Sequence, residues 1–460
     1  LDLMIIFDFI KLLKRALFVC FMVLSFVKEA IQTAESSDVE RIKFAKDDGT
    51  DLIADLHIHS RFSRATSKNI TIPLLVKYAR MKGINLLGTG DISHEKWLAD
   101  IKQYLHERDK NGIYYFKCED GLEFPFMLTG EISLVFSTGG KGRRVHLIYF
   151  APNLDAVAKI NKYLDTLGRR DYDGRPIFSV SCEEFVRQMM LIDKKIEVIP
   201  AHIWTPWFGA FGSKSGFNSL KEAFGSQYEN VHAIETGMSS DPEMNWKITE
   251  LSEKAILSFS DSHSHWPWRL GREATIFSLK DGEKISYDLI INQIRTKSFK
   301  STIETDPGYG IYHYDGHRGC NFSCAPKKTI ELGGICPICK KPLTIGVENR
   351  VEVLANHKGI PLNAKPFHKI LPLHELIAFY LKTKITSKKV IPIYEKLIAK
   401  FGNEFNILLK VDKNVLTTEL AKEKQEKLAD LIIDNRISNL KVKPGYDGVY
   451  GILVEKNSLK

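Results

Sequence analysis

The sequence lacks a hydrophobic run long enough to span a lipid bilayer. The run at residues 16–27 holds twelve residues, whereas a transmembrane helix needs about 20. Basic residues precede this run and small and polar residues follow it, so residues 1–50 resemble a secretory signal peptide. Because the chain begins with Leu1 and not with methionine, an untranslated upstream stretch or an alternative start explains the same residues, as does an amphipathic helix. We expect residues 1–50 to be an extension outside the functional core, and we expect no stable membrane association.

The sequence also has little cysteine, with seven residues in 460. Cys20, Cys118 and Cys182 are isolated, which is typical of buried or free thiols. The remaining four form two close pairs separated by a short loop, and this is the spacing that tetrahedral zinc requires. These four are Cys320, Cys324, Cys336 and Cys339. Two disulfides are the alternative, but the Cys-Pro-Ile-Cys-Lys-Lys-Pro knuckle favours a structural zinc site and a reducing, cytoplasmic location.

The chain as a whole also lacks a strong excess of positive or negative charge. Its formal net charge is +9 over 460 residues, but residues 362–460 hold 18 Lys and Arg against 11 Asp and Glu. This basic C-terminal part indicates a polyanionic partner such as nucleic acid, and a solvated, lysine-rich helical surface explains it equally well. With 44% hydrophobic and 10% aromatic residues, a chain of this length can form more than one globular domain with a sizeable core.

Six short stretches, each following an apolar segment, carry side chains that bind metal ions. His57 and His59 stand two residues apart, so in an extended strand both imidazoles project from one face, and Asp261 and His263 repeat that spacing. A carboxylate such as Glu131 can bridge two ions. The predicted ligands are His57, His59, Asp91, Glu131, His146, His202, Asp261 and His263. A lone histidine at a strand end is more often a satisfied polar residue. Eight such side chains together predict a hydrolytic centre with two or three divalent ions, Zn²⁺, Mn²⁺ or Mg²⁺.

Residues 51 to about 305 alternate strand-like and helix-like patterns. Thr71 predicts the N-cap of a helix, Pro73 suits an early helical position, and Gly83 predicts the end of the helix. A strand-like stretch at residues 86–89 follows and leads to Asp91. Such repetition predicts an α/β fold with mostly parallel strands, whose active site gathers at the carboxyl ends of the strands as in βα barrels.

Several segments resemble one known family. DLHIHS, the TGD turn, PAHIWTPW and the DSH motif near residue 262 resemble the polymerase and histidinol phosphatase (PHP) superfamily of metal-dependent phosphoesterases. KGINLLGTGDISH, GYGIYHYDGHRGC, ICPICKKPLTIGV and PGYDGVYG look more specifically like the endonuclease Q family of archaeal and bacterial DNA-repair enzymes. The similarity covers roughly residues 51–455.

The resemblance implies a fold, a domain organisation and an activity. It implies a distorted PHP-type βα barrel in residues 51–305, an inserted or appended zinc-binding module in residues 306–361, and a mostly helical, basic DNA-binding domain in residues 362–460. The implied reaction is hydrolysis of the phosphodiester on the 5′ side of a deoxyuridine, deoxyinosine, deoxyxanthosine or abasic site, with the damaged base flipped out of the duplex. Damaged DNA is the expected partner, the expected state is a monomer, and a sliding clamp is a candidate second partner.

Carried over from the family, His57 and His59 hold one ion and Glu131 bridges it to a second, with Asp261 nearby. One departure concerns the stretch that follows. Many PHP proteins have an aspartate soon after the two histidines, where this chain has Arg61-Phe-Ser-Arg64. We therefore expect that one ion is held differently, or that the arginines face a phosphate.

Aromatic and basic side chains are candidates for contact with a flipped base and with the DNA backbone. Aromatic rings stack on unpaired bases, and cations meet phosphates. For the aromatic residues the alternative is packing in a small core or at the rim of the barrel, and for the cations it is ordinary surface charge. The candidates are Arg61, Arg64, Trp204, Trp207, Tyr309, Tyr312, Tyr314, His317 and Arg318, with Lys214, Arg269, Arg272 and Arg295 as further phosphate contacts.

Two other functions fit parts of the sequence. A PHP phosphatase that acts on a small phosphate ester would use the eight predicted ligands, but residues 306–460 would then have no role. A non-catalytic, metal-stabilised DNA-binding protein would use those residues, but the near-complete ligand set argues against it.

Overall fold

The computed structural model describes residues 49–455. Residues 1–48, which hold nearly all of the predicted N-terminal extension, lie outside the described residues. Every helix and strand of the described part belongs to one unit, made of residues 47–361 and 367–460. None of the helices between residues 49 and 455 is long and apolar enough to cross a membrane.

An eleven-stranded mixed sheet organises the first part of the chain. Its central order is β15-β12-β11-β1-β2-β5-β4-β3, with β6 paired to β5 and β8, and β7 paired to β5. The strands are β1 (Gly49–Asp55), β2 (Leu86–Gly88), β3 (Leu105–Glu107), β4 (Ile113–Lys117), β5 (Glu123–Thr138), β6 (Lys141–Ala151), β7 (Ile177–Phe178), β8 (Glu197–Pro200), β11 (Ala274–Lys280), β12 (Ser301–Glu304) and β15 (Phe367–Lys369). A separate parallel pair is formed by β9 (Ala233–Glu235) and β10 (Ala255–Leu257). The mixed α/β fold agrees with the prediction, and closure into a barrel stays a prediction.

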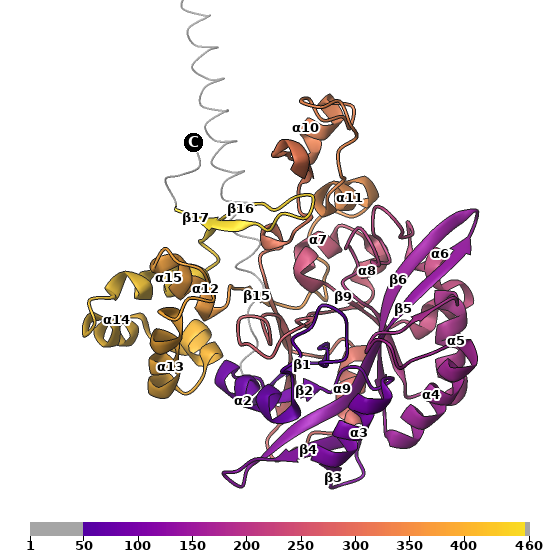
Figure 1. The fold of residues 1–460 in the computed structure, drawn as a ribbon, viewed down its shortest axis with the longest axis horizontal. Coiled ribbons are helices and arrows are strands. Elements are labelled where there is room, and N and C mark those ends of the chain that lie inside the picture. Colours follow the sequence, from indigo (N-terminus) through magenta and orange to yellow (C-terminus); the bar gives the residue numbers. More distant parts are fainter. Residues whose placement is uncertain (1–48, 456–460) are drawn as a thin grey trace, which may run out of the picture. The chain divides into compact units, whose positions relative to one another are not determined.

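The prediction of mostly parallel strands is wrong. β1 and β2 are parallel, as are β2 and β5, but β11 runs antiparallel to β1, and β5 and β6 form a long antiparallel hairpin. Figure 1 shows this hairpin as the longest ribbon of the molecule. Gly139 and Gly140 at its tip have φ values of 57° and 72°, which suit the tight turns that join neighbouring antiparallel strands. The apolar pattern of a buried strand does not reveal its direction, so the sequence could not show this difference.

The helices of this part cover the sheet, and α2 follows its sequence signals closely. The Thr71 hydroxyl accepts a hydrogen bond from the Leu74 amide, and the helix ends at Gly83, which has a φ of 98°, so the predicted start and end are confirmed. The helices are α2 (Ile72–Lys82), α3 (Glu95–Tyr104), α4 (Leu154–Leu167), α5 (Cys182–Ile192), α6 (Leu220–Phe224), α7 (Pro242–Trp246), α8 (Thr249–Ser252) and α9 (Tyr287–Arg295), with 3₁₀ turns η2 (Gly225–Asn230), η3 (Gly237–Ser239) and η4 (Pro307–Tyr309).

The core lies between strands of the main sheet and α9. Leu52 and Ala54 on β1, Met127 on β5 and Ile148 on β6 are fully or almost fully buried in one cluster. The apolar face of α9, including Ile290, joins the same cluster. Because Leu52 on β1, Ile199 on β8 and Leu257 on β10 are packed in this core, the residues that follow these strands start from fixed positions.

Residues 306–361, here called the cysteine module, form a small hairpin followed by two helices. Its elements are β13 (Asp315–His317), η5 (Arg318–Cys320), β14 (Phe322–Cys324), α10 (Pro326–Glu331) and α11 (Val347–Leu354). All six described cysteines are free, so the alternative of two disulfides is wrong.

The C-terminal part is mostly helical, as predicted, and ends in a short hairpin (Figure 1). Its elements are α12 (Leu373–Tyr380), α13 (Val390–Phe401), the π-turn η6 (Asn406–Lys410), α14 (Lys413–Ala421), α15 (Glu426–Arg436), β16 (Lys441–Lys443) and β17 (Ile452–Val454). Lys82 at the end of α2 donates to the buried Glu404 carboxylate at 2.6 Å. This ion pair connects the C-terminal helices with the first part of the chain.

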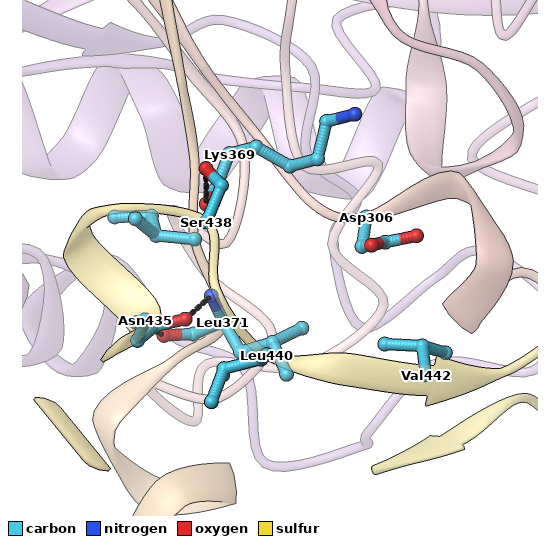
Figure 2. Close-up of a pocket in the computed structure, with 8 residues that line it drawn as sticks. Asp306, Lys369, Leu371, Asn435, Ser438, Leu440 and Val442 are labelled. Carbon is cyan, nitrogen blue, oxygen red and sulfur yellow. Dashed lines mark hydrogen bonds between the residues drawn. The ribbon is translucent and has the colours of Figure 1, made fainter. Parts of the chain in front are cut away.

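Figure 2 shows a small pocket where β15, α15 and β16 meet. Its polar groups are already satisfied. Asn435 exchanges two hydrogen bonds with the backbone of Leu371, and Lys369 forms an ion pair with Asp241 at 2.6 Å. The pocket therefore serves to join these elements, and we assign no ligand to it.

Candidate metal centre

Seven of the eight predicted ligands come together at one place. His57 and His59 follow β1, His202 follows β8, and Asp261 and His263 follow β10. Glu131 and His146 instead lie within β5 and β6, so the prediction that every ligand stands at a strand end is wrong for these two. His146 pairs with Ser133, two residues from Glu131. Both side chains therefore project from the same face of the hairpin, since alternate residues of a strand share a face.

The first donor group contains His57, His59 and Glu131, whose ligand atoms all lie within 4.8 Å of one another. The Glu131 Oε2 atom is 3.3 Å from His59 Nε2 and 3.6 Å from His57 Nε2. His59 Nε2 also lies 3.1 Å from Asp261 Oδ1, and His59, Asp261 and His263 form a second donor group. His59 therefore belongs to two adjoining groups.

The third donor group contains Glu131, His146 and His202. The second carboxylate oxygen of Glu131 lies 3.0 Å from His146 Nδ1 and 3.5 Å from His202 Nε2, and the two ring nitrogens are 3.1 Å apart. Two nitrogens that share one tetrahedral zinc ion lie roughly 3.3 Å apart. The spacing therefore suits a shared ion, and Glu131 presents one oxygen to each of two donor groups.

Two orphaned atoms test whether this cluster fits metal ions. Among residues 49–455, buried His57 Nε2 and Glu131 Oε1 make no geometrically aligned hydrogen bond, although Glu131 Oε1 lies 3.0 Å from His146 Nδ1. A buried polar atom without a partner is costly, and native proteins nearly always satisfy such groups. Both atoms point into the donor groups described above, where a cation would satisfy them. The residues present thus fit a divalent-metal centre, with imidazole and carboxylate ligands that suit Zn²⁺ or Mn²⁺.

Asp91 lies behind His59 and is not among the donor groups. Its carboxylate accepts from the Ser60 amide at 2.7 Å and the Ser63 hydroxyl at 2.8 Å, and lies 2.9 Å from His59 Nδ1. A carboxylate in this place fixes the tautomer and the orientation of a ligand histidine. In the structure, Asp91 makes this contact with His59. Its role as a metal ligand stays a prediction.

The backbone is strained at three of the eight predicted ligands. Asp91, His202 and Asp261 have φ values of 47°, 29° and 46°, in a region that residues other than glycine seldom adopt. Such positions cost on the order of 1–3 kcal/mol each and cluster at functional sites. Gly90 has a φ of 63° and no room for a side chain, since a Cβ there would lie 2.2 Å from the Ile58 carbonyl oxygen. The turn after β2 can thus press against the turn after β1.

The electrostatics of the cluster favour a bound cation. Burial alone would lower the pKa of His57, but the carboxylates of Glu235, Glu131 and Asp261 outweigh it and raise that pKa well above its usual value. Burial would likewise raise the pKa of Glu131, but His146 and Arg175 hold it well below its usual range. Carboxylates that can hold a proton on a buried imidazole can hold a divalent ion in its place.

Two residues of the site were missed by the sequence analysis. Glu235, the last residue of β9, lies 2.8 Å from His57 Nδ1 and accepts from the His202 amide at 2.7 Å. Glu235 follows an apolar strand-like segment, as the predicted ligands do, so the same sequence signal could have identified it. Arg175 donates to Glu131 at 3.1 Å. It lies in a loop before β7 and carries no such signal.

Some of the candidate DNA contacts are exposed and could reach DNA, whereas others are buried or already paired within the protein. Trp204 is fully buried, donates to Asn245 and packs against Phe211, so its assignment as a DNA contact is wrong. Arg61 pairs with Asp100 at 2.6 Å and lies over the ring of Trp97, so it is held away from the metal centre. Arg64 keeps 69% of its side chain exposed, beside Asp173.

The remaining candidates lie around the start of the cysteine module. Trp207 packs edge-to-face against Tyr312 at 5.3 Å between ring centroids. The Arg318 side chain is exposed, and its backbone amide donates to Asp447. Tyr314 and Tyr309 are partly buried, and a neighbouring Glu375 helps desolvation to raise the pKa of Tyr309. Among the further phosphate candidates, Arg272 donates to the Ser260 carbonyl and Arg295 donates to Glu197. Within the described residues 49–455, the side chains of Lys214 and Arg269 make no such hydrogen bond.

The cysteine module holds a second candidate metal site. Its donor group is His317, Cys320, Cys336 and Cys339. Cys324 is not part of this group, and its sulfur lies 3.3 Å from the Thr329 hydroxyl. This corrects the predicted four-cysteine set. His317, predicted as a DNA contact, has its Nδ1 atom 3.4 Å from the Cys339 sulfur. Three cysteines and one histidine are a common ligand set of structural zinc.

Comparison with known proteins places the chain beside lesion-specific nucleases. The crystal structure of the lesion-specific endonuclease PfuEndoQ from Pyrococcus furiosus matches with a TM-score of 0.77 and 28% identity, over 89% of this chain and 97% of that one. A structure of endonuclease Q with a 27-mer duplex bearing an abasic lesion at its active site matches with a TM-score of 0.76 and 28% identity, over 89% of this chain and all of that one.

Two further matches come from sequence. The uncharacterized protein MJ0043 of Methanocaldococcus jannaschii is 29% identical over 292 residues, which are 62% of this chain and 34% of that protein. The chain thus spans about a third of the length of this relative. The family model named for the MJ0043 C-terminal domain matches residues 372–437, which contain helices α12 to α15.

Proposed function

We propose that this protein, a member of the endonuclease Q family, is a DNA-repair endonuclease that hydrolyses the phosphodiester on the 5′ side of a deaminated base or an abasic site. Deoxyuridine, deoxyinosine and deoxyxanthosine are the deaminated nucleosides we expect. DNA is the partner, consistent with the duplex bound by the family member of known structure. We expect a monomeric, cytoplasmic protein, and a sliding clamp is a candidate for recruitment.

One observation carries the proposal: three donor groups adjoin and share residues. Glu131 links the pair His57 and His59 to the pair His146 and His202, and His59 links the first group to Asp261 and His263. A single structural ion would not need shared ligands. Adjoining sites of this kind are typical of centres that cleave phosphate esters with two or three ions.

The chain's own residues have definite parts in such a reaction. His57, His59, Glu131, His146, His202, Asp261 and His263 would hold the ions. Bound there, the ions would supply an activated water and would stabilise negative charge on the phosphate. Glu235 and Asp91 hold the imidazoles of His57 and His59 from behind. Arg175 lies beside Glu131 with its guanidinium in the site, where it would contact a non-bridging phosphate oxygen.

Recognition of a damaged base requires a surface beside the metal centre that can accept an unstacked base. Trp207, which is 37% exposed, and the half-buried Tyr312 form an aromatic pair that joins the loop after His202 to the start of the cysteine module. The cysteine module would then hold one side of this surface in place. This gives residues 306–361 a role that hydrolysis of a small phosphate ester would leave unexplained.

A nicking assay tests the proposal. The substrate is a labelled duplex with one deoxyinosine, and the proteins are the wild type, Asp261→Asn, and Asp281→Asn as a control on an exposed aspartate after β11. We expect the wild type and Asp281→Asn to give one product with a 3′-hydroxyl, ending just before the lesion. Asp261→Asn should lose on the order of 100-fold or more, since even residues behind metal ligands are worth about 10–100-fold.

Two outcomes would favour the other functions. If the wild type leaves lesion duplexes intact but hydrolyses a small phosphate ester, the protein is a phosphatase and the proposal is wrong. Binding of DNA without turnover of either substrate, with metals present, would indicate a non-catalytic DNA-binding protein.

A further inference from the structure

An open hollow lies between the β5–β6 hairpin and the loop of residues 203–217. Its volume is about 650 Å³. The hairpin contributes residues near its tip, and the loop contributes Trp207 and Lys214. The lining residues are Val135, Phe136, Ser137, Gly142, Arg143, Arg144, Ser179, Trp207, Lys214 and Ser215. None of them is acidic.

This hollow lies along the same strand as part of the metal centre. Arg144 lies two residues before His146 on β6, so both side chains share one face of the hairpin, about 7 Å apart along the strand. The loop is attached to the same strand by two backbone hydrogen bonds, from the His146 amide to the Phe208 carbonyl and from the Arg144 amide to the Ser215 carbonyl. The Phe208 ring lies 4.2 Å from the His146 ring. The lining of the hollow therefore begins two residues along β6 from His146, which belongs to the third donor group.

The cations of the hollow are of two kinds. Arg143 is buried and bound to Glu222 at 2.8 Å and to the Gly216 carbonyl, so it shapes the wall. Arg144 and Lys214 are exposed, and among residues 49–455 neither side chain has an ion pair or hydrogen bond with a carboxylate. Two unneutralised cations in a hollow without acidic residues favour an anionic occupant, and two separate cations suit a polyanion more than a single small ion.

An aromatic ring completes the hollow. Trp207 is 37% exposed, although large aromatic side chains are usually buried. It is held by the edge-to-face contact with Tyr312. The backbone of Phe208 next to it has a φ of 65°, a strained value for a bulky residue. An exposed and fixed aromatic ring beside two cations is the arrangement by which proteins bind single-stranded nucleic acid, because unpaired bases offer their faces for stacking.

We propose that this hollow binds a short single-stranded DNA segment that continues from the phosphodiester at the metal centre, with Arg144 and Lys214 on its phosphates and Trp207 stacked on a base. The inference deepens the proposed endonuclease function and rests on it. A closed duplex would leave Trp207 without a stacking partner, so the occupant is the strand that has been opened next to the lesion.

The test measures binding of a fluorescein-labelled 15-nucleotide poly-dT strand to the full-length protein by fluorescence anisotropy at several salt concentrations. The variants are the double substitution Arg144→Ala/Lys214→Ala, and Trp207→Ala with Trp207→Phe as its conservative partner. The control is Lys159→Ala/Lys162→Ala, which removes two exposed cations of α4. All of these side chains are exposed at the surface, so we expect the variants to fold.

Loss of two phosphate contacts should reduce the slope of log K against log salt by about 1.4 for a single strand. Trp207→Ala should weaken binding about 5-fold to 100-fold, and Trp207→Phe should restore most of it. The control should keep the wild-type slope and affinity. The control should also keep the wild-type rate of hydrolysis of bis(p-nitrophenyl) phosphate, which is too small to reach the hollow.

Three results would overturn the inference. These are an unchanged slope in the double variant, an equal loss in the control, and a wild type that does not bind the single strand. The proposed function fails separately, when the wild type does not nick a lesion duplex. A protein without nicking activity could still bind single-stranded DNA through Arg144, Lys214 and Trp207. In that case the inference about the hollow would hold and the proposed endonuclease function would be wrong.

Discussion

At the scale of single residues, Glu235 is the clearest addition that the structure makes. One carboxylate oxygen lies beside Nδ1 of His57, and the other accepts from the backbone amide of His202. Glu235 thereby fixes ligands that belong to two different donor groups. Its own position is fixed by the short parallel pair of β9 and β10. We regard it as a positioning residue, because it contacts ligands and not the substrate.

Substitution of Glu235 by glutamine should lower the affinity for divalent metal about 10–100-fold, the usual effect of losing such a partner. The amide keeps the shape of the side chain but no longer holds the His57 ring by charge. Competition with a chelating dye measures the affinity independently of activity. Glu197→Gln is a matched control, since Glu197 makes the same contact with His232 Nδ1 at 2.8 Å, outside the donor groups. An equal loss in both variants would contradict the role of Glu235.

At the scale of elements, the cysteine module shows how a short hairpin selects its ligands. β13 and β14 pair antiparallel, with His317 opposite Phe322 and Asp315 opposite Cys324. Cys324 is therefore at the other end of the hairpin from His317, and its sulfur lies beside Thr329. Desolvation would raise the pKa of Cys336, but the amides of Cys339 and Ile338 outweigh it and lower that pKa. A thiolate is the form that binds zinc.

Two serine substitutions separate the ligand sets. Cys336→Ser should lose the module's zinc and unfold at a lower temperature, since structural zinc contributes directly to folding free energy. Cys324→Ser should keep one zinc ion per module and the wild-type melting temperature within a few degrees. Metal content of the purified proteins and thermal unfolding measure both effects. Retention of zinc by Cys336→Ser, or its loss from Cys324→Ser, would restore the four-cysteine assignment.

At the scale of the whole molecule, a buried ion pair joins the C-terminal helices to the first part of the chain. Lys82 is 1% exposed and donates to Glu404 and to the Pro267 carbonyl. Glu404 also accepts from the Leu373 amide and the Tyr394 hydroxyl. Burial lowers the pKa of Lys82, and the Glu404 carboxylate opposes that shift. The metal centre and the C-terminal helices are thus parts of one packed structure.

Removal of one partner should show this coupling. Lys82→Met should cost about 3–5 kcal/mol of the free energy of unfolding, because it leaves the Glu404 charge buried and unpaired. Lys82→Met/Glu404→Gln should recover much of the loss. Urea unfolding followed by circular dichroism measures both. A change within about 0.5 kcal/mol in the single variant, as for an ordinary surface residue, would show that the helices do not pack on α2.

The sequence by itself determined the features that depend on local spacing. The His-x-His and Asp-x-His pairs place two side chains on one side of an extended segment, and Thr71 and Gly83 bound a helix because capping involves only neighbouring residues. Recurrent apolar segments likewise indicated an α/β fold.

The tertiary structure alone decided which distant residues meet. Glu235 behind His57, Arg175 beside Glu131, His317 in place of Cys324, and the burial of Trp204 all join segments whose separation in sequence carries no information about contact. Strand direction is also decided only by the tertiary structure, since the apolar pattern of β6 would be the same whether β6 ran parallel or antiparallel to β5. Local patterns fix what a segment can be. Its neighbours are fixed only when all the segments have buried their apolar faces together.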